Sequence, residues 1–203
     1  MSHNQNGFSL IELAVALAII GLMITPLVEM LPGYIQFKKR TETKATIELI
    51  TTAMTGYIII NQTFPCADVD GDGIQDYNDG KCYYRGGLPW ADLGVGRYDA
   101  WDNSFNYVMT KGLTADKFDN YIPSKYELKF AHDEVVDEPL LFPAIVWSDG
   151  MKDNDFPDEL ENRNGGSVFV DSPYVQDYYD DVVAGIPLYP ILYMLAKTRD
   201  LEQ

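Results

Sequence analysis

Residues 8–31 read FSLIELAVALAIIGLMITPLVEML, an apolar stretch near the start of the chain. A membrane-spanning helix needs about 20 predominantly apolar residues, and this stretch has that length. Residues 1–37 contain no Lys or Arg. The pattern therefore predicts a single membrane-spanning helix at residues 8–31.

Two other interpretations compete for this stretch. A cleaved secretory signal needs a basic start and a shorter apolar core, whereas this chain starts MSHNQNG and stays apolar beyond Thr25 and Pro26. A buried core helix of a soluble protein would tolerate Glu12 and Glu29 near its ends, so that interpretation stays open.

Composition narrows the class of protein. The 203 residues include 15 Lys and Arg against 31 Asp and Glu, a net charge of -16. This length suits one main domain with an additional long helix. Because nucleic-acid binding depends on cations that displace counterions from phosphates, we expect no nucleic-acid partner. With 46% hydrophobic and 13% aromatic residues, the chain is expected to fold.

Glu12 lies inside the apolar stretch, where a carboxylate is costly and needs a partner. Residues 7–13, GFSLIEL, resemble the cleavage and methylation signature of type IV pilins and their type II secretion relatives. The resemblance implies that prepilin peptidase cuts after Gly7 and that the new N-terminal Phe8 is N-methylated. It also implies that Glu12 neutralises the N-terminal amine of a neighbouring subunit. A carboxylate and an ammonium that are each costly when buried alone offset one another when paired.

The same resemblance implies an α+β fold, in which a long N-terminal helix packs its second half on an antiparallel β-sheet head. Ile47, Ile50, Met54 and Tyr57 recur at helical spacing within that second half. The expected parts are a leader (1–7), a transmembrane and assembly helix (8–31), the second half of the helix (32–62) and the head (63–203). Two separate helices with a loop at residues 31–33 are the alternative, since Pro26 and Pro32 each remove a backbone donor.

Residues 64–81, FPCADVDGDGIQDYNDGK, have the ligand spacing of a calcium loop. Gly73 stands at position six of a twelve-residue loop of the EF-hand type. The predicted ligands are the side chains of Asp68, Asp70, Asp72, Asp76 and Asp79 and the carbonyl of Ile74. Ca²⁺ is therefore the expected cofactor. Asp79 replaces the usual Glu at position twelve, and the unit resembles the calcium repeats of thrombospondin or dockerin modules. A solvated turn without an ion is the alternative.

Cys66 and Cys82 are the two cysteines of the chain, and they bracket the calcium loop. A disulfide between them would stabilise the fold by about 3 kcal/mol in the chain-entropy model. It would also require an oxidising compartment. We therefore expect a single-pass inner-membrane protein with a periplasmic head, although Lys38, Lys39 and Arg40 alone would place the C-terminal part in the cytoplasm.

Three further segments attract attention. Residues 88–107, which begin LPW and contain DAWDNSFNY, resemble parts of minor pilin heads, with Asp102 where Gly is common. Residues 178–183, YYDDVV, resemble a segment near the end of related minor pilins, in which Asp180 and Asp181 would hold the terminal strand or its loop. For the acidic residues within 149–162, a second calcium site and a solvated loop are both open interpretations.

Residues for catalysis are scarce, because His132 is the one histidine left after leader removal and both cysteines are expected to pair. We therefore predict a structural protein and not an enzyme. The predicted function is a minor subunit of a type IV pilus or related type II secretion filament. Its expected partners are other pilin or pseudopilin subunits, prepilin peptidase and the inner membrane. A minor pilin is preferred because the head is large and acidic. The alternative is a membrane-tethered, calcium-stabilised adhesive or binding module.

Overall fold

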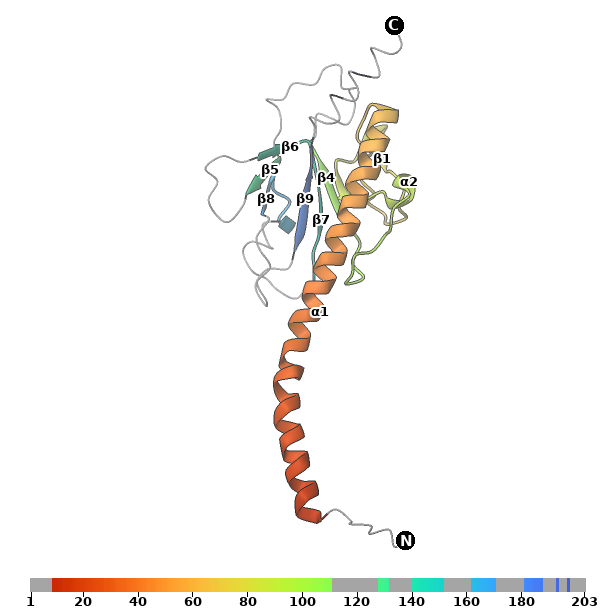
Figure 1. The fold of residues 1–203 in the computed structure, drawn as a ribbon. Coiled ribbons are helices and arrows are strands. Elements are labelled where there is room, and N and C mark those ends of the chain that lie inside the picture. Colours follow the sequence, from red (N-terminus) through yellow and green to blue (C-terminus); the bar gives the residue numbers. More distant parts are fainter. Residues whose placement is uncertain are drawn as a thin grey trace. The chain divides into compact units, whose positions relative to one another are not determined.

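The computed structural model describes residues 9–110, 128–131, 140–151, 162–170 and 181–187, together with Tyr193 and Lys197 (Figure 1). Two helices lie within these residues, α1 (Leu10–Asn61) and α2 (Trp90–Leu93). The strands there are β1 (Tyr77–Asn78), β2 (Lys81–Cys82), β3 (Arg85–Gly87), β4 (Asn106–Met109), β5 (Leu128–Ala131), β6 (Leu140–Phe142), β7 (Ala144–Ser148), β8 (Val168–Val170) and β9 (Val182–Ile186). The chain divides into two compact units, Met1–Lys38 and Lys39–Gln203, which are described separately.

Helix α1 is continuous over 52 residues, so the alternative of two helices separated by a loop at residues 31–33 is wrong. A capping box stabilises its first turn. The backbone N–H of Ser9 donates to Glu12 Oε2 at 2.9 Å, and the N–H of Glu12 donates to Ser9 Oγ at 3.3 Å. This reciprocal pair satisfies two donors that a helix start otherwise leaves unpaired.

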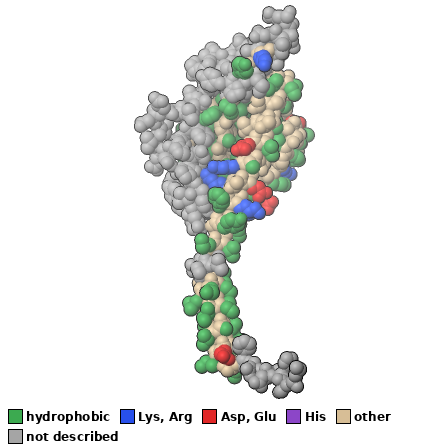
Figure 2. Space-filling view, viewed as in Figure 1, with side chains coloured by type: hydrophobic (Ala, Val, Ile, Leu, Met, Phe, Trp, Pro, Cys, Tyr) green, Lys and Arg blue, Asp and Glu red, His purple; other side chains and the backbone are tan. Residues whose placement is uncertain are grey.

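In the first unit, α1 exposes its large apolar side chains. Leu10, Leu22 and Met23 are 89%, 77% and 67% exposed. We call this part of α1, residues 10–38, the stem, and Figure 2 shows hydrophobic side chains along its described part. By length and composition the helix qualifies to cross a membrane, with a mean hydropathy of 2.4 over its best window. Within the described residues these side chains stay exposed, which is the pattern expected of a helix that lies in a membrane.

In the second unit, α1 is amphipathic. Ile47, Ile50, Met54 and Ile58 recur every three or four residues and are at most 3% exposed. They belong to one apolar cluster with residues of strands β4, β7 and β9. The predicted helical periodicity is therefore confirmed for these positions, whereas Tyr57 lies beside this stripe and is only half-buried.

The helix packs against a sheet of strand order β3-β4-β7-β9, in which every neighbouring pair is antiparallel. Both faces of this sheet are covered. Tyr107 and Val146 belong to the cluster with α1, while Ile145 and Trp147 belong to a second cluster with Phe169. Because β7 is buried on both sides, its sequence AIVWS is apolar without alternation. The predicted α+β fold, a long helix on an antiparallel sheet, is confirmed.

The second, three-stranded sheet has the order β6-β5-β8 and departs from the antiparallel expectation. Strand β5 pairs with β6 antiparallel but with β8 parallel. Parallel neighbours need a long connection and no tight turn, and 36 residues separate Ala131 from Val168 in the sequence. Pro143, which has no N–H to donate to a sheet, separates β6 from β7.

Candidate functional site

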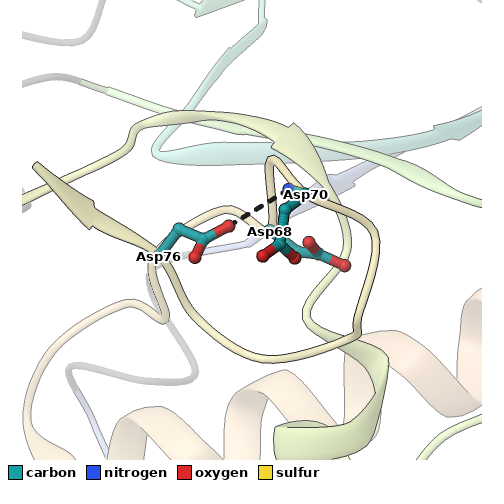
Figure 3. Close-up of side chains that lie close together, drawn as sticks. All are labelled: Asp68, Asp70 and Asp76. Atoms are coloured by element: carbon teal, nitrogen blue, oxygen red, sulfur yellow. Dashed lines mark hydrogen bonds between the residues drawn. The ribbon is translucent and has the colours of Figure 1, made fainter.

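The acidic loop, residues 68–76, follows the C-terminal end of α1 and precedes β1. Carboxylate atoms of Asp68, Asp70 and Asp76 lie within 4.8 Å of one another, so the three can share one ion (Figure 3). Asp68 is buried, whereas Asp70 is exposed. In the part of the chain that the structure describes, these carboxylates form no salt bridge with Lys or Arg. Three adjacent negative charges repel one another, and a bound cation would remove that repulsion.

Backbone amides hold the loop in shape. Asp68 accepts hydrogen bonds from the N–H groups of Gly71 and Gly73 at 2.6 and 2.8 Å. Asp76 Oδ2 accepts from the N–H of Val69 at 2.7 Å and from that of Asp70 at 3.2 Å, the bond dashed in Figure 3. Each of these carboxylates has two oxygens with two lone pairs apiece, so metal ligation remains compatible with the bonds.

Glycine is required at position six of the loop for two reasons. Gly73 has φ of 89°, a conformation that L side chains rarely adopt. A Cβ there would also clash with the ring of Trp90. The sequence spacing predicts Gly73 at this position but carries no signal for the Trp90 ring that packs against it.

The structure brings together three of the predicted ligands and leaves others outside the group. Asp72 Oδ1 accepts a hydrogen bond from the N–H of Ile74 at 2.8 Å. Asp79 and Gly80 have φ of 50° and 75° and form the two-residue turn between β1 and β2. Positive φ at both turn residues is the reason that Asp-Gly favours such hairpins. The sequence therefore contained a hairpin signal that the calcium-loop interpretation overlooked.

A disulfide joins Cys66 to Cys82, with a Cα–Cα distance of 5.2 Å, as the sequence predicted. It links the residue two before Asp68 to the end of strand β2. Asp68 also exchanges two backbone hydrogen bonds with Gly87 of β3, at 2.6 and 3.0 Å. The loop is therefore tied to the head on both sides of its aspartates.

Gln75 and Asp92 complete this support, and sequence reasoning missed both. Asp92 Oδ2 accepts from the backbone N–H and from Nε2 of Gln75, both at 3.0 Å. Gln75 Oε1 accepts from the N–H of Cys66 at 2.8 Å and from the Tyr57 hydroxyl at 3.2 Å. The sequence gives no sign that Gln75 would connect these groups, because the contacts depend on α1, which carries Tyr57, and on α2, which carries Asp92.

Asp99 is 6% exposed and organises the turn in the DAWDNSF segment. Its Oδ1 accepts from the N–H groups of Trp101 and Asn103, both at 2.8 Å, and its Oδ2 accepts from the Ser148 hydroxyl. Asp102 has φ of 66°, a left-handed backbone conformation that favours Gly. Asp tolerates that conformation better than most side chains, so the turn is kept.

Asp181 is fully buried and joins three parts of the head. Its carboxylate accepts from Asn162 Nδ2 at 2.9 Å and lies 3.6 Å from Arg163 Nη2. Its backbone carbonyl accepts from Arg40 Nη1 of α1 at 2.9 Å. Arg40, counted in the sequence as part of a basic cluster, is therefore buried against the head and is only 6% exposed.

The acidic segment 149–162, for which a second calcium site and a solvated loop are both open interpretations, lies mostly outside the described residues, as does Asp180. Of its members, Asp149 pairs with Arg163 at 3.6 Å and accepts from Trp147 Nε1 at 3.0 Å. Asn162 bonds Asp181 and the backbone of Val170. These two side chains serve contacts within the head.

The predicted cleavage and methylation residues, Gly7 and Phe8, lie outside the described residues, whereas Glu12 lies in the first turn of α1. Residues 2–31 match the family described as the prokaryotic N-terminal methylation motif. No curated protein and no solved structure matches the chain. The chain therefore carries the N-terminal methylation motif typical of the type IV pilin and pseudopilin family, on a helix that packs against a pilin-like antiparallel sheet.

Proposed function

We propose that this chain is a minor subunit of a type IV pilus or of a related type II secretion filament. The observation that carries the proposal is the methylation motif at the start of a helix that exposes large apolar side chains along residues 10–35. Such a surface needs a membrane before assembly and neighbouring helices afterwards. Members of this family are typically structural subunits without enzymatic activity.

In the proposed pathway, prepilin peptidase cleaves between Gly7 and Phe8, and Phe8 is then N-methylated. Glu12 pairs with the N-terminal amine of a neighbouring subunit. The leader is residues 1–7, the assembly helix 8–31, the remaining helix 32–62 and the head 63–203. The position of Glu12 in the first turn of a helix that is otherwise apolar there supports this role.

Before assembly, the chain is proposed to span the inner membrane once, with its head in the periplasm. The Cys66–Cys82 disulfide supports an oxidising location for the head. Burial of Arg40 supports it as well, because one of the three basic residues that favour a cytoplasmic head is occupied within the fold.

We also propose that the acidic loop binds Ca²⁺. The core of the site is Asp68, Asp70 and Asp76, whose oxygens are close enough to share an ion. Calcium takes six to eight oxygen ligands, so Asp72, Asp79, the Ile74 carbonyl or water would complete the shell. The disulfide and the Gln75 bridge hold the loop in place before an ion arrives.

The decisive experiment measures incorporation of Glu12→Ala into filaments, by immunoblotting sheared and membrane fractions. A filament subunit should be lost from the sheared fraction because the neighbour's amine would lack its partner. Ser9→Ala is the matched control, since it removes one bond of the capping box but keeps the carboxylate. Normal incorporation of Glu12→Ala would favour the alternative, a membrane-tethered adhesive or binding module.

Intact mass of the membrane-extracted chain tests processing independently. The expected mass lacks Met1 to Gly7 and gains one methyl group. A chain that retains its leader in a strain with active prepilin peptidase would contradict the proposal.

A further inference from the structure

A polar cavity of about 280 Å³ lies where the two sheets of the head meet, and we call it the Arg85 pocket. Its walls come from β3, the end of β4, the start of β5 and the turn before β8. The residues that matter to its chemistry are Tyr84, Arg85, Thr110, Leu128, Gly166 and Ser167. None of the described lining residues is acidic, and the site is separate from the aspartate loop.

Arg85 supplies a cation held in a fixed orientation. Its guanidinium stacks 5.2 Å from the Trp147 ring centroid and 5.6 Å from that of Phe169. Nη1 donates to the Gly166 carbonyl at 3.0 Å and Nη2 to the Asn162 carbonyl at 3.2 Å. A guanidinium has five N–H donors, so donors remain for a ligand.

No anion balances this cation within the described parts of the chain. Arg85 forms no salt bridge there, since the ion pairs recorded involve Arg163. Burial lowers the pKa of the Arg85 guanidinium from its ordinary value, because removal of water disfavours the charged form. An anion that enters the pocket would stabilise the charged form of the guanidinium in place of the removed water.

Thr110 provides a second, independent observation that points to a ligand. The residue is 6% exposed, and its N–H donates to the Pro143 carbonyl at 2.8 Å. Its hydroxyl Oγ1 is buried without a hydrogen-bond partner. Buried hydroxyls are normally paired, because an unpaired one costs about 1–3 kcal/mol. The same residue lines the Arg85 pocket.

We infer that the Arg85 pocket binds the carboxylate of an acidic side chain presented by another protein chain. A guanidinium fork and a hydroxyl are donors that suit a carboxylate. The cavity lies below the usual 300–1,000 Å³ of small-molecule sites, and its size suits one side chain. Copies of this chain carry 31 Asp and Glu against 15 Lys and Arg, so carboxylates would be abundant at any contact between heads.

The partner that we infer is a second copy of this chain, the neighbouring subunit of a filament, and only this identification rests on the proposed function. The pocket and its ligand chemistry stand without it. If Glu12→Ala were incorporated normally, the proposed function would be wrong, but a head that binds the glutamate probe would still be a carboxylate-binding module. The two proposals can therefore fail separately.

The test uses the full chain in neutral detergent micelles with ¹⁵N-labelled arginine. The probe is N-acetylglutamate amide, and its glutamine counterpart is the uncharged control. We expect a saturable shift of the Arg85 side-chain signal with the glutamate probe at millimolar concentration and none with the glutamine probe. Arg85→Lys should identify the signal by removing it from the spectrum.

Thr110→Val separates a ligand-binding hydroxyl from a structural one. The variant should bind the glutamate probe about tenfold more weakly, the effect expected for a lost hydrogen bond to a charged group. Its melting temperature without probe should equal or exceed that of the unaltered chain. Thr51→Val is the matched control, since the Thr51 hydroxyl bonds the Ile47 carbonyl within α1 and lies outside the pocket.

Two results would overturn the inference. The first is an equal response to the glutamate and glutamine probes, or no saturable response to either. The second is a lower melting temperature for Thr110→Val without probe, because the hydroxyl would then already be paired within the chain.

Discussion

The two halves of α1 belong to one unbroken helix and yet bury their apolar side chains in different ways. Met23 is 67% exposed, whereas Met54 is fully buried. Residues 10–25 are apolar nearly all round, so no face of that half is suited to water. Around Met54, buried apolar residues recur every three or four positions, and Thr and Glu occupy several of the positions between them. The amphipathic half is covered by its own head, and the uniformly apolar half needs a cover from outside the chain.

Truncation of one methionine in each half should separate these two roles most clearly. Met54→Ala should lower the free energy of unfolding of the head by about 2–5 kcal/mol, because it leaves a cavity in the core. Met23→Ala should change head unfolding by less than about 0.5 kcal/mol. Urea titration of both variants in micelles, followed by near-ultraviolet circular dichroism, measures the difference. Equal effects would mean that the first half is also buried by the head.

Loss of the disulfide should act on the head alone. The Cys66→Ser, Cys82→Ser double variant should be destabilised by about 3 kcal/mol, because the bond restricts a loop of 16 residues in the unfolded chain. The same urea titration reports the loss, and the helical signal of the stem in micelles should persist. Disappearance of that signal as well would show that the first half of α1 depends on the folded head.

Calcium should also stabilise the head and leave the stem unchanged. At a free concentration 100 times the Kd, bound Ca²⁺ adds about 2.7 kcal/mol to the free energy of unfolding, which chelation should remove. Asp76→Asn should weaken calcium binding by at least tenfold in calorimetric titration, because Asp76 belongs to the close carboxylate group.

Asp79→Asn is the informative control, because the spacing assigns Asp79 to position twelve while the structure places it in the β1–β2 turn. We expect its calcium affinity to stay within a factor of three of the unaltered chain. Equal losses in both variants would show that the loop closes around position twelve when an ion binds. No calcium binding by the unaltered chain would contradict the proposed site.

The smallest expected effect concerns Tyr107, which shares the core with Met54 and donates to the Pro65 carbonyl at 3.1 Å. Burial, and secondarily Tyr57, raise the pKa of Tyr107 well above its ordinary value of 10.0. Above pH 10 the unfolded chain therefore loses this proton first, and the free energy of unfolding falls as pH rises. Tyr107→Phe should cost about 1 kcal/mol at pH 8 through the lost hydrogen bond.

The difference in the free energy of unfolding between Tyr107→Phe and the unaltered chain should become smaller between pH 10 and 11, because the variant lacks the titrating hydroxyl. Urea titrations at pH 8, 10 and 11 measure it. A gap that stays constant over this range would show that Tyr107 does not contribute to the alkaline loss of stability.

Several features followed from the sequence because their signals are local. An apolar run of membrane length, the GFSLIEL motif and the helical spacing of Ile47, Ile50 and Met54 each lie within a few turns of one helix. Cys66 and Cys82 are the two cysteines of the chain, so the sequence allowed one intramolecular disulfide, which the structure contains. The close grouping of Asp68, Asp70 and Asp76 likewise agrees with a spacing read along one short loop.

Other features depend on residues that are far apart in the chain. The parallel pairing of β5 with β8, the stacking of Arg85 on Trp147 and Phe169 and the contact of Arg40 with Asp181 have no counterpart in sequence spacing. Asp79 suited both a calcium position and a hairpin turn, and the pairing of β1 with β2 shows that it takes the turn position. Local patterns determined the helix, the disulfide and the acidic loop, whereas packing between distant segments decided which of several suitable roles each polar side chain took.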